Sequence, residues 1–277
     1  MDQSLLETMR VIALPTKTNF RGVTVREVAL FHGEYGWGEF SPFLEYGDLE
    51  SSRWLASAVE AATRPRPVRL RTAIAVNGTI PAINDGERLK SIIDSYPGCQ
   101  TFKVKIGENI GEDLLRLKLL TTIRPTSAIR VDVNGLWSVA EALVNLAQIY
   151  RECKNIQYVE QPCATVDQLR ELKERADFPL KIAADEAIRK ADDPFALDLT
   201  GAADVVMLKV QPLGGIERSQ KIAAHHGLPV VVSSALESAV GIQYGLALAA
   251  SIEHLTLDSG LATGSLISRD VAHLPIV

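Results

Sequence analysis

The stretch Thr101-Phe-Lys-Val-Lys-Ile-Gly107 is typical of a short apolar strand that carries two lysines and ends in a glycine. Side chains two residues apart in a strand point to the same face, so we expect Lys103 and Lys105 to lie side by side. Two ammonium groups that close together disfavour each other's protonation, which can lower a lysine pKa toward the range of a working base. Taken alone, the stretch also fits an exposed strand end with two solvated lysines.

Similar strands recur from residue 72 onward and alternate with helical segments, a pattern that indicates parallel β–α units. Reference positions near the strand ends, from 105 to 257, are 24 to 28 residues apart, which fits one strand, one helix and two loops. Residues 112–123 and 139–150 show the amphipathic pattern of the intervening helices. The eight predicted strands centre on residues 72–76, 101–105, 129–133, 156–160, 181–184, 204–208, 229–233 and 254–257.

Eight units of this kind, in about 190 residues, have the size of a small (β/α)8 barrel. A doubly wound open sheet is the alternative architecture, but the sequence has no glycine-rich phosphate turn after the first strand. The predicted fold class is therefore α/β, a (β/α)8-type barrel with a small N-terminal α+β capping domain.

The residues that precede the barrel predict a small antiparallel sheet and a helix. The predicted strands are 8–14, 22–31 and 36–40, the polar loop is 15–22 and the helix is 49–62. The Arg64-Pro-Arg-Pro-Val68 stretch cannot continue a helix, so it marks a boundary. The predicted domains are a capping domain at 1–68, a catalytic barrel at 69–265 and a C-terminal tail at 266–277 that packs back on the cap.

The composition is that of an ordinary globular protein of 277 residues, 47% hydrophobic and 23% charged. A net charge of -5 and the lack of lysine–arginine runs argue against a nucleic-acid partner or an anionic membrane surface. Three well-separated cysteines fit reduced thiols, and we see neither an export signal nor an apolar run of about 18 residues. We expect a cytoplasmic protein; the sequence leaves its oligomeric state open and is compatible with a monomer.

Three consecutive predicted strands end in acidic residues, Asp132, Glu160 and Asp185. Neighbouring strands lie about 5 Å apart, so these carboxylates can converge, and convergent carboxylates repel unless a hard cation lies between them. Oxygen-only ligation suits Mg²⁺, for which Mn²⁺ can substitute. Each acid alone also fits a helix N-cap. Asn134 and Glu186, beside two of the acids, are expected to orient ligands or lysines.

Lys209 ends the sixth predicted strand, which lies opposite the second strand in a ring of eight. Lys105 and Lys209 are therefore expected on two sides of a substrate whose carboxylate binds the metal. This arrangement suits removal of a proton α to a carboxylate, because one lysine can take the proton while the other ammonium stabilises the developing charge. A structural ion pair with one of the acids is the alternative for Lys209.

These strand ends resemble the motifs of the enolase superfamily, in its muconate-lactonizing-like branch. Within that branch, residues 20–27, 233–241 and 260–264 resemble the o-succinylbenzoate synthase family. The resemblance implies a Mg²⁺-dependent dehydratase, a carbon–oxygen lyase that converts 2-succinyl-6-hydroxy-2,4-cyclohexadiene-1-carboxylate, a small dicarboxylate, to 2-succinylbenzoate in menaquinone synthesis. The matching motifs are Lys103-Val-Lys105, Asp132-Val-Asn134, Glu160-Gln-Pro162, Asp185-Glu186 and Leu208-Lys209.

By motif position, the resemblance implies that Lys105 is the base and returns its proton to the departing hydroxyl in a syn elimination. Lys209 would hold the opposite face by a cation–π contact, and Lys103 would tune Lys105 and help hold the carboxylate. Arg21, a more speculative contact, equally fits a solvated loop arginine. The residues expected near the substrate's second carboxylate are Ser233, Ser234, Gly264 and Arg21.

Other activities remain open at this point. Two opposed lysines also suit a racemase or epimerase of N-acylamino acids or dipeptides. A Schiff-base aldolase that uses Lys209, or a catalytically silent barrel that serves as a binding module, belongs to a different class. The capping domain is short, which leaves open how fully it covers the site.

Overall fold

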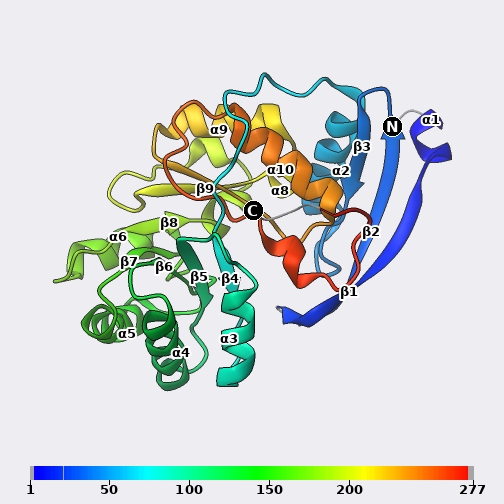
Figure 1. Cartoon of the computed structure of the whole chain (residues 1–277). Coiled ribbons are helices and arrows are strands. Elements are labelled where there is room, and N and C mark those ends of the chain that lie inside the picture. The colour runs from blue at the N-terminus through cyan, green and yellow to red at the C-terminus, as the bar shows by residue number, and fades with distance from the viewer. Residues whose placement is uncertain (1–2, 21, 274–277) are drawn as a thin grey trace. The chain divides into compact units, whose positions relative to one another are not determined.

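The computed structural model describes residues 3–20 and 22–273 (Figure 1). These residues form two compact units. One unit contains the residues up to 75, together with 208–225 and 231 onward, and the other contains 76–207 and 226–230. In the part of the chain that is described, no helix is both long enough and apolar enough to cross a bilayer.

The N-terminal part of the first unit is an antiparallel sheet with strand order β1-β2-β3. Its elements are α1 (Gln3–Glu7), β1 (Arg10–Phe20), β2 (Val23–Gly33), β3 (Gly36–Phe40) and α2 (Asp48–Thr63). The sheet and α2 were predicted, but the polar loop expected at 15–22 is wrong, because β1 continues through Pro15. Proline is tolerated in an edge strand, and the register of β1 shifts after it.

Helix α2 packs closely on this sheet. Trp54 is fully buried, and Ala58 and Ala62 form an apolar cluster with Phe31 and Leu5. At Gly38 the backbone approaches so closely that a Cβ atom would meet the Ala58 carbonyl oxygen. Glycine at this position therefore allows the helix to lie directly on β3.

The second architectural element is a parallel sheet with strand order β10-β9-β8-β7-β6-β5-β4. Each strand lies next to the strand that precedes it in the sequence, as in a (β/α)8-type barrel. The predicted strands from the second to the seventh are confirmed within a few residues. The strands are β4 (Gly78–Ile80), β5 (Thr101–Lys105), β6 (Ala128–Asp132), β7 (Ile156–Glu160), β8 (Ile182–Ala184), β9 (Val205–Lys209) and β10 (Val230–Ser233).

Helices connect these strands, and the two helices predicted at 112–123 and 139–150 are confirmed as α4 and α5. Figure 1 shows α3, α4 and α5 next to one another along one face of the strands. The connecting elements are α3 (Gly86–Asp94), α4 (Ile110–Ile123), α5 (Val139–Glu152), α6 (Val166–Arg175), α7 (Glu186–Arg189), η1 (Pro194–Ala196), α8 (Val210–Leu213), α9 (Ile216–His226), α10 (Ala239–Ser251) and η2 (Thr263–Leu266).

The predictions for the first and eighth strands need correction. The first strand is β4 at residues 78–80 rather than 72–76, and residues 254–257 form no strand. Instead, Ser259 donates its N–H to the Ala75 carbonyl and Gly260 donates to the Val232 carbonyl, both at 2.8 Å. Of the alternating residues before them, His254 and Thr256 are exposed and Leu255 and Leu257 are only partly buried, so full burial begins at Ser259. A two-residue bridge thus takes the place predicted for a strand.

The C-terminal part of the described chain lies against the N-terminal sheet within the first unit. Ile267 pairs with Thr16 in an isolated antiparallel bridge, and the N–H of Ser268 donates to the Pro15 carbonyl at 2.8 Å. The side chains of Leu266 and Ile267 belong to one apolar cluster with Leu14 of β1 and residues of β2.

Candidate active site

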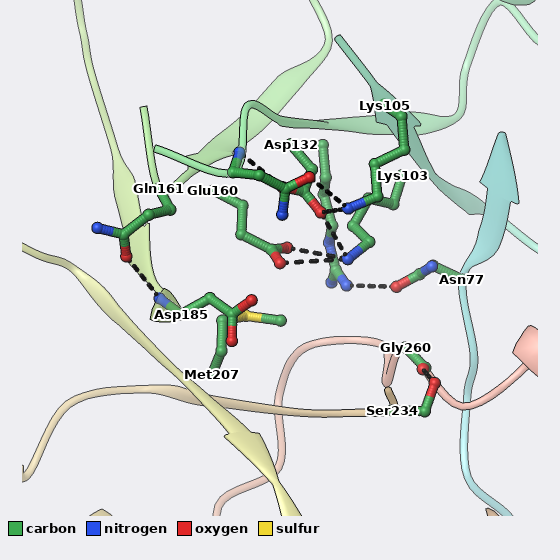
Figure 2. Close-up of polar contacts among 12 residues, drawn as sticks. Asn77, Lys103, Lys105, Asp132, Glu160, Gln161, Asp185, Met207, Ser234 and Gly260 are labelled. Carbon is green, nitrogen blue, oxygen red and sulfur yellow. Dashed lines mark hydrogen bonds and ion pairs between the residues drawn. The ribbon is translucent and has the colours of Figure 1, made fainter. Parts of the chain in front are cut away.

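The carboxyl ends of β5, β6 and β7 are level with one another because the strands pair in register. Lys105 is opposite Asp132, and Asp132 is opposite Glu160. Asp132 and Glu160 have no exposed surface, and Asp185, which follows β8, is 1% exposed. Figure 2 shows the Asp132 and Glu160 carboxylates together with the amines of Lys103 and Lys105. Charged groups therefore gather where the strands end.

Both lysines bind the carboxylates directly. The Lys103 Nζ lies 3.0 Å from Asp132 Oδ2 and 3.2 Å from Glu160 Oε1. The Lys105 Nζ lies 2.5 Å from the same Asp132 oxygen and 2.9 Å from Asn134 Oδ1. Their side chains are only 8% and 13% exposed. The structure therefore excludes the alternative of a solvated strand end.

Burial and neighbouring charge act differently on the two amines. Burial lowers the pKa of Lys103, but the adjacent carboxylates of Asp132 and Glu160 outweigh it and hold the pKa above its ordinary value. For Lys105, burial outweighs Asp132 and, with the charge of Lys103, lowers the pKa. A lowered pKa favours the neutral amine that a general base needs. The tuning role expected of Lys103 is consistent with this direction, with burial as the larger cause, and it remains a prediction.

The side chains of the acidic strand ends do not cap helices. The side chains that cap α3, α4, α5 and α6 belong to other residues, Asp85, Asn109, Ser138 and Thr165. Asp185 directly precedes α7, but its side chain makes no capping hydrogen bond. The burial of these carboxylates therefore calls for a reason other than helix capping.

Asn134 links the lysine pair to the next acids. Its side-chain oxygen accepts from Lys105, and its Nδ2 donates to Glu186 Oε1 at 3.1 Å. Arg189, one turn later in α7, donates to the same Glu186 oxygen at 2.8 Å and lies 3.4 Å from Asp185 Oδ1. Asn134 has a φ of 55°, in the left-handed region that asparagine adopts more readily than most residues. The orienting role predicted for Asn134 and Glu186 is consistent with these bonds, and it remains a prediction.

Gln161, at the end of β7, has a role that the sequence did not indicate. It also has a positive φ, 41°. Its buried side-chain oxygen accepts from the backbone N–H of Asp185 at 3.0 Å and of Ala187 at 3.2 Å, and its amide nitrogen donates to the Cys163 carbonyl at 2.8 Å. Gln161 thus holds the backbone of the acidic pair that follows β8.

A second polar layer lies one pleat below the strand ends, where Lys103 pairs with Arg130 and Arg130 with Tyr158. Arg130 is fully buried; its guanidinium lies 4.8 Å from the centre of the Tyr158 ring and donates to Gln157 and to Asn77. No role was predicted for this cation from the sequence. Its position two residues before Asp132, on the same strand face, was the available signal.

The carboxylates match a hard divalent cation in donor type because each offers only oxygen. In this structure Lys103 contacts both Asp132 and Glu160, and within the described ranges no three His, Cys, Asp or Glu side chains are grouped closely enough to hold a metal ion. One oxygen of Glu186 is buried without a hydrogen-bond donor among these residues. The residues therefore fit a cation by the chemistry of their oxygen donors.

The other predicted site residues lie in the first unit. Lys209 ends β9 and is 5% exposed, Ser233 ends β10, and Gly264 lies in η2. The Ser234 hydroxyl donates to the Gly260 carbonyl at 2.8 Å (Figure 2) and lies 2.6 Å from the Thr263 hydroxyl. Ser234 thus ties the end of β10 to the glycine-rich loop. Arg21 lies outside the described residues.

Comparison with known proteins covers nearly the whole chain. Residues 11–62 match the family model described as Enolase N-terminal domain-like, and residues 88–276 match the one described as Enolase C-terminal domain-like. The chain is 46% identical to an o-succinylbenzoate synthase of Mycolicibacterium smegmatis, over 97% of the chain and 83% of that protein. It is 47% identical to an o-succinylbenzoate synthase of Mycobacterium ulcerans, over 97% of the chain and 81% of that protein.

Solved structures support the same fold. The L-Ala-D/L-Glu epimerase from Bacillus subtilis, in a substrate-liganded complex, aligns with a TM-score of 0.78 at 22% identity, over 95% of this chain and 90% of that one. The muconate cycloisomerase from Pseudomonas fluorescens aligns with a TM-score of 0.74 at 22% identity, over 97% and 90% of the two chains. At this identity the likeness shows a shared architecture, the predicted barrel-type fold with a capping domain.

Proposed function

The chain belongs to the o-succinylbenzoate synthase family of the enolase superfamily and is a lyase; we propose that it dehydrates 2-succinyl-6-hydroxy-2,4-cyclohexadiene-1-carboxylate to 2-succinylbenzoate in menaquinone synthesis. The observation that carries the chemistry is the buried array of Lys105, Asp132 and Glu160 on strand ends in register. Such an array suits proton removal next to a substrate carboxylate.

Superfamily members typically use a divalent metal, and here we propose Mg²⁺, with Mn²⁺ as a substitute. Asp132, Glu160 and Asp185 would hold it, because they are buried carboxylates at the ends of three adjacent strands. When bound, the cation supplies positive charge that stabilises the negative charge developing on the substrate carboxylate. Arg189 and Gln161 would keep Asp185 in place through its side chain and its backbone N–H.

In the proposed reaction the Lys105 amine takes the α proton. The electron pair of the broken C–H bond moves toward the carboxylate and then forms the new ring double bond as the C–O bond to the hydroxyl breaks. The proton on Lys105 passes to the departing oxygen, so the product leaves with one molecule of water. The lowered pKa of Lys105 supports this role, because the amine must be neutral to accept the proton.

Three further groups are assigned roles in this proposal. Lys103, whose pKa is raised, keeps its positive charge next to Lys105 and helps hold the substrate carboxylate. Lys209 stabilises the negative charge on the opposite face of the ring. Ser233 donates its hydroxyl to the second carboxylate, whereas Ser234 shapes the subsite together with the loop that contains Gly264, because its own hydroxyl already donates to Gly260.

The test is direct. Purified protein is incubated with the cyclohexadiene substrate and Mg²⁺, and the aromatic product is followed by its ultraviolet absorbance. Product formation that stops when a chelator removes the metal supports the proposal. If no product forms while N-succinylamino acids racemise, the activity is that of a racemase or epimerase instead.

A further inference from the structure

The carboxylate of Glu39 forms bonds that neither the motifs nor the proposed chemistry account for. Glu39 lies in β3, is 3% exposed, and accepts from three donors at the start of α10. These donors are the backbone N–H of Ser238 at 3.2 Å, the Ser238 hydroxyl at 2.5 Å and the N–H of Gly241 at 2.9 Å. The Ser41 hydroxyl of its own segment donates at 2.7 Å. One buried carboxylate of the N-terminal sheet therefore holds the segment that follows β10.

That segment needs such support because its backbone is strained. Leu236 has a φ of 62°, which is costly for a branched side chain. The Leu236 carbonyl accepts from Arg26 Nε at 3.1 Å, and its side chain packs in the apolar cluster with Leu14 and Val28. Residues of the antiparallel sheet thus hold both sides of the turn that begins at Ser233 and Ser234.

Capping of α10 alone does not account for Glu39. An anionic group stabilises a helix N-terminus, but Asp270 already accepts from the N–H of Ala239 through both oxygens, at 3.0 and 3.1 Å. A comparable carboxylate, Glu60 of α2, accepts from the N–H of Ile216 at the start of α9, at 2.6 Å. Glu39 and Glu60 differ in the segment that precedes the helix each of them binds. Of these two carboxylates, Glu39 is the one that binds next to the turn that carries the two serines.

We propose that Glu39 is a positioning residue for substrate recognition: by holding Ser238 and Gly241 it sets the Ser233–Ser234 turn for the second carboxylate of a dicarboxylate substrate. The inference rests on the proposed function, in which this turn meets that carboxylate. Glu39 acts through the turn and does not itself touch the substrate, since its oxygens accept from Ser238, Gly241 and Ser41 and, at 3.4 Å, from the side-chain amide of Gln211.

The experiment uses two ligands that differ by one carboxylate, 2-succinylbenzoate and 2-butanoylbenzoate, titrated calorimetrically into the full chain with Mg²⁺. Glu39→Gln places an amide opposite N–H donors and loosens the turn. We expect it to weaken the binding of 2-succinylbenzoate by about tenfold or more and to leave the affinity for 2-butanoylbenzoate unchanged. Glu60→Gln, the matched control, is expected to lower the melting temperature and leave the affinity for both ligands as in the wild type.

A second pair of variants covers the case in which Glu39→Gln does not fold. Ser238→Ala removes one donor on the turn side of the Glu39 carboxylate, and Ser41→Ala removes one on the β3 side. Selective weakening of 2-succinylbenzoate in Ser238→Ala alone supports the proposal. Equal loss for both ligands, or no loss, overturns it. A wild-type protein that makes no 2-succinylbenzoate from the cyclohexadiene substrate shows instead that the proposed function has failed.

Discussion

Glu237 lies in the turn after β10. Replacing it by glutamine is expected to remove a pH dependence of the free energy of unfolding. Burial, and to a lesser extent the nearby carboxylate of Glu39, raise the pKa of Glu237 to about 7, against the lowering effects of the N–H of Ala235 and the guanidinium of Arg26. Glu39 lies in β3, Ala235 in the turn itself and Arg26 in β2. Between the unfolded pKa, near 4.5, and the folded pKa, the native state keeps a proton that the unfolded chain has released.

The sign follows from this proton. Since the native state binds more protons than the unfolded state in this window, the free energy of unfolding falls as pH rises from about 4.5 to about 7 and then stays at the lower value. At about 1.4 kcal/mol per pKa unit, the full window corresponds to about 3 kcal/mol. Glutamine carries no titrating proton, so the variant lacks this decline.

The assay is denaturant unfolding of the wild type and Glu237→Gln at about pH 5 and about pH 8. We expect the loss of stability over that interval to be smaller in the variant by about 2 to 3 kcal/mol. Glu45→Gln, which alters an exposed carboxylate near Arg26, is the control and keeps the wild-type pH dependence. Identical pH profiles for the wild type and Glu237→Gln would refute the reasoning.

Three further predictions concern packing and the metal. Gly38→Ala is expected to destabilise the protein by about 3 kcal/mol, because its Cβ would meet the carbonyl oxygen of α2 below it, whereas Gly47→Ala, with open space around it, shifts the melting temperature little; equal melting temperatures would contradict this. Glu160→Ala is expected to abolish Mg²⁺-dependent turnover while far-ultraviolet circular dichroism stays unchanged, and retained turnover would remove Glu160 from the ligand set. Arg189→Met is expected to weaken Mg²⁺ binding about 10- to 100-fold in calorimetry, because Asp185 and Glu186 lose the guanidinium group that orients them. Unchanged affinity would show that other groups hold these two carboxylates.

The parallel strands and their charged ends were predictable because they depend on local patterns. The strand period is visible in the sequence, and side chains at the same offset must meet when strands pair in register, as Lys105, Asp132 and Glu160 do. The same logic extends to Arg130, which lies one pleat below Asp132. The layer beneath the strand ends is therefore predictable on the same grounds as the strand ends themselves.

Other features depend on contacts distant in the sequence. Residues 254–257 alternate like a strand, but Leu255 and Leu257 are only partly buried, and the chain pairs with the sheet only at Ser259 and Gly260. Glu39 is an ordinary acid in the sequence, and its role arises from Ser238 and Gly241, about 200 positions later. The partner of such a residue is decided by tertiary packing, which local propensity does not encode.

The central claim is that Lys105 removes the α proton of the substrate. Its most direct test incubates Lys105→Ala with Mg²⁺ and the cyclohexadiene substrate in D₂O and follows the α position by NMR. The account predicts that no deuterium enters this position and that no 2-succinylbenzoate forms, while Lys209→Ala, which keeps the base, still exchanges the α proton. Deuterium entry in Lys105→Ala, with none in Lys209→Ala, would contradict the claim and move the base role to Lys209.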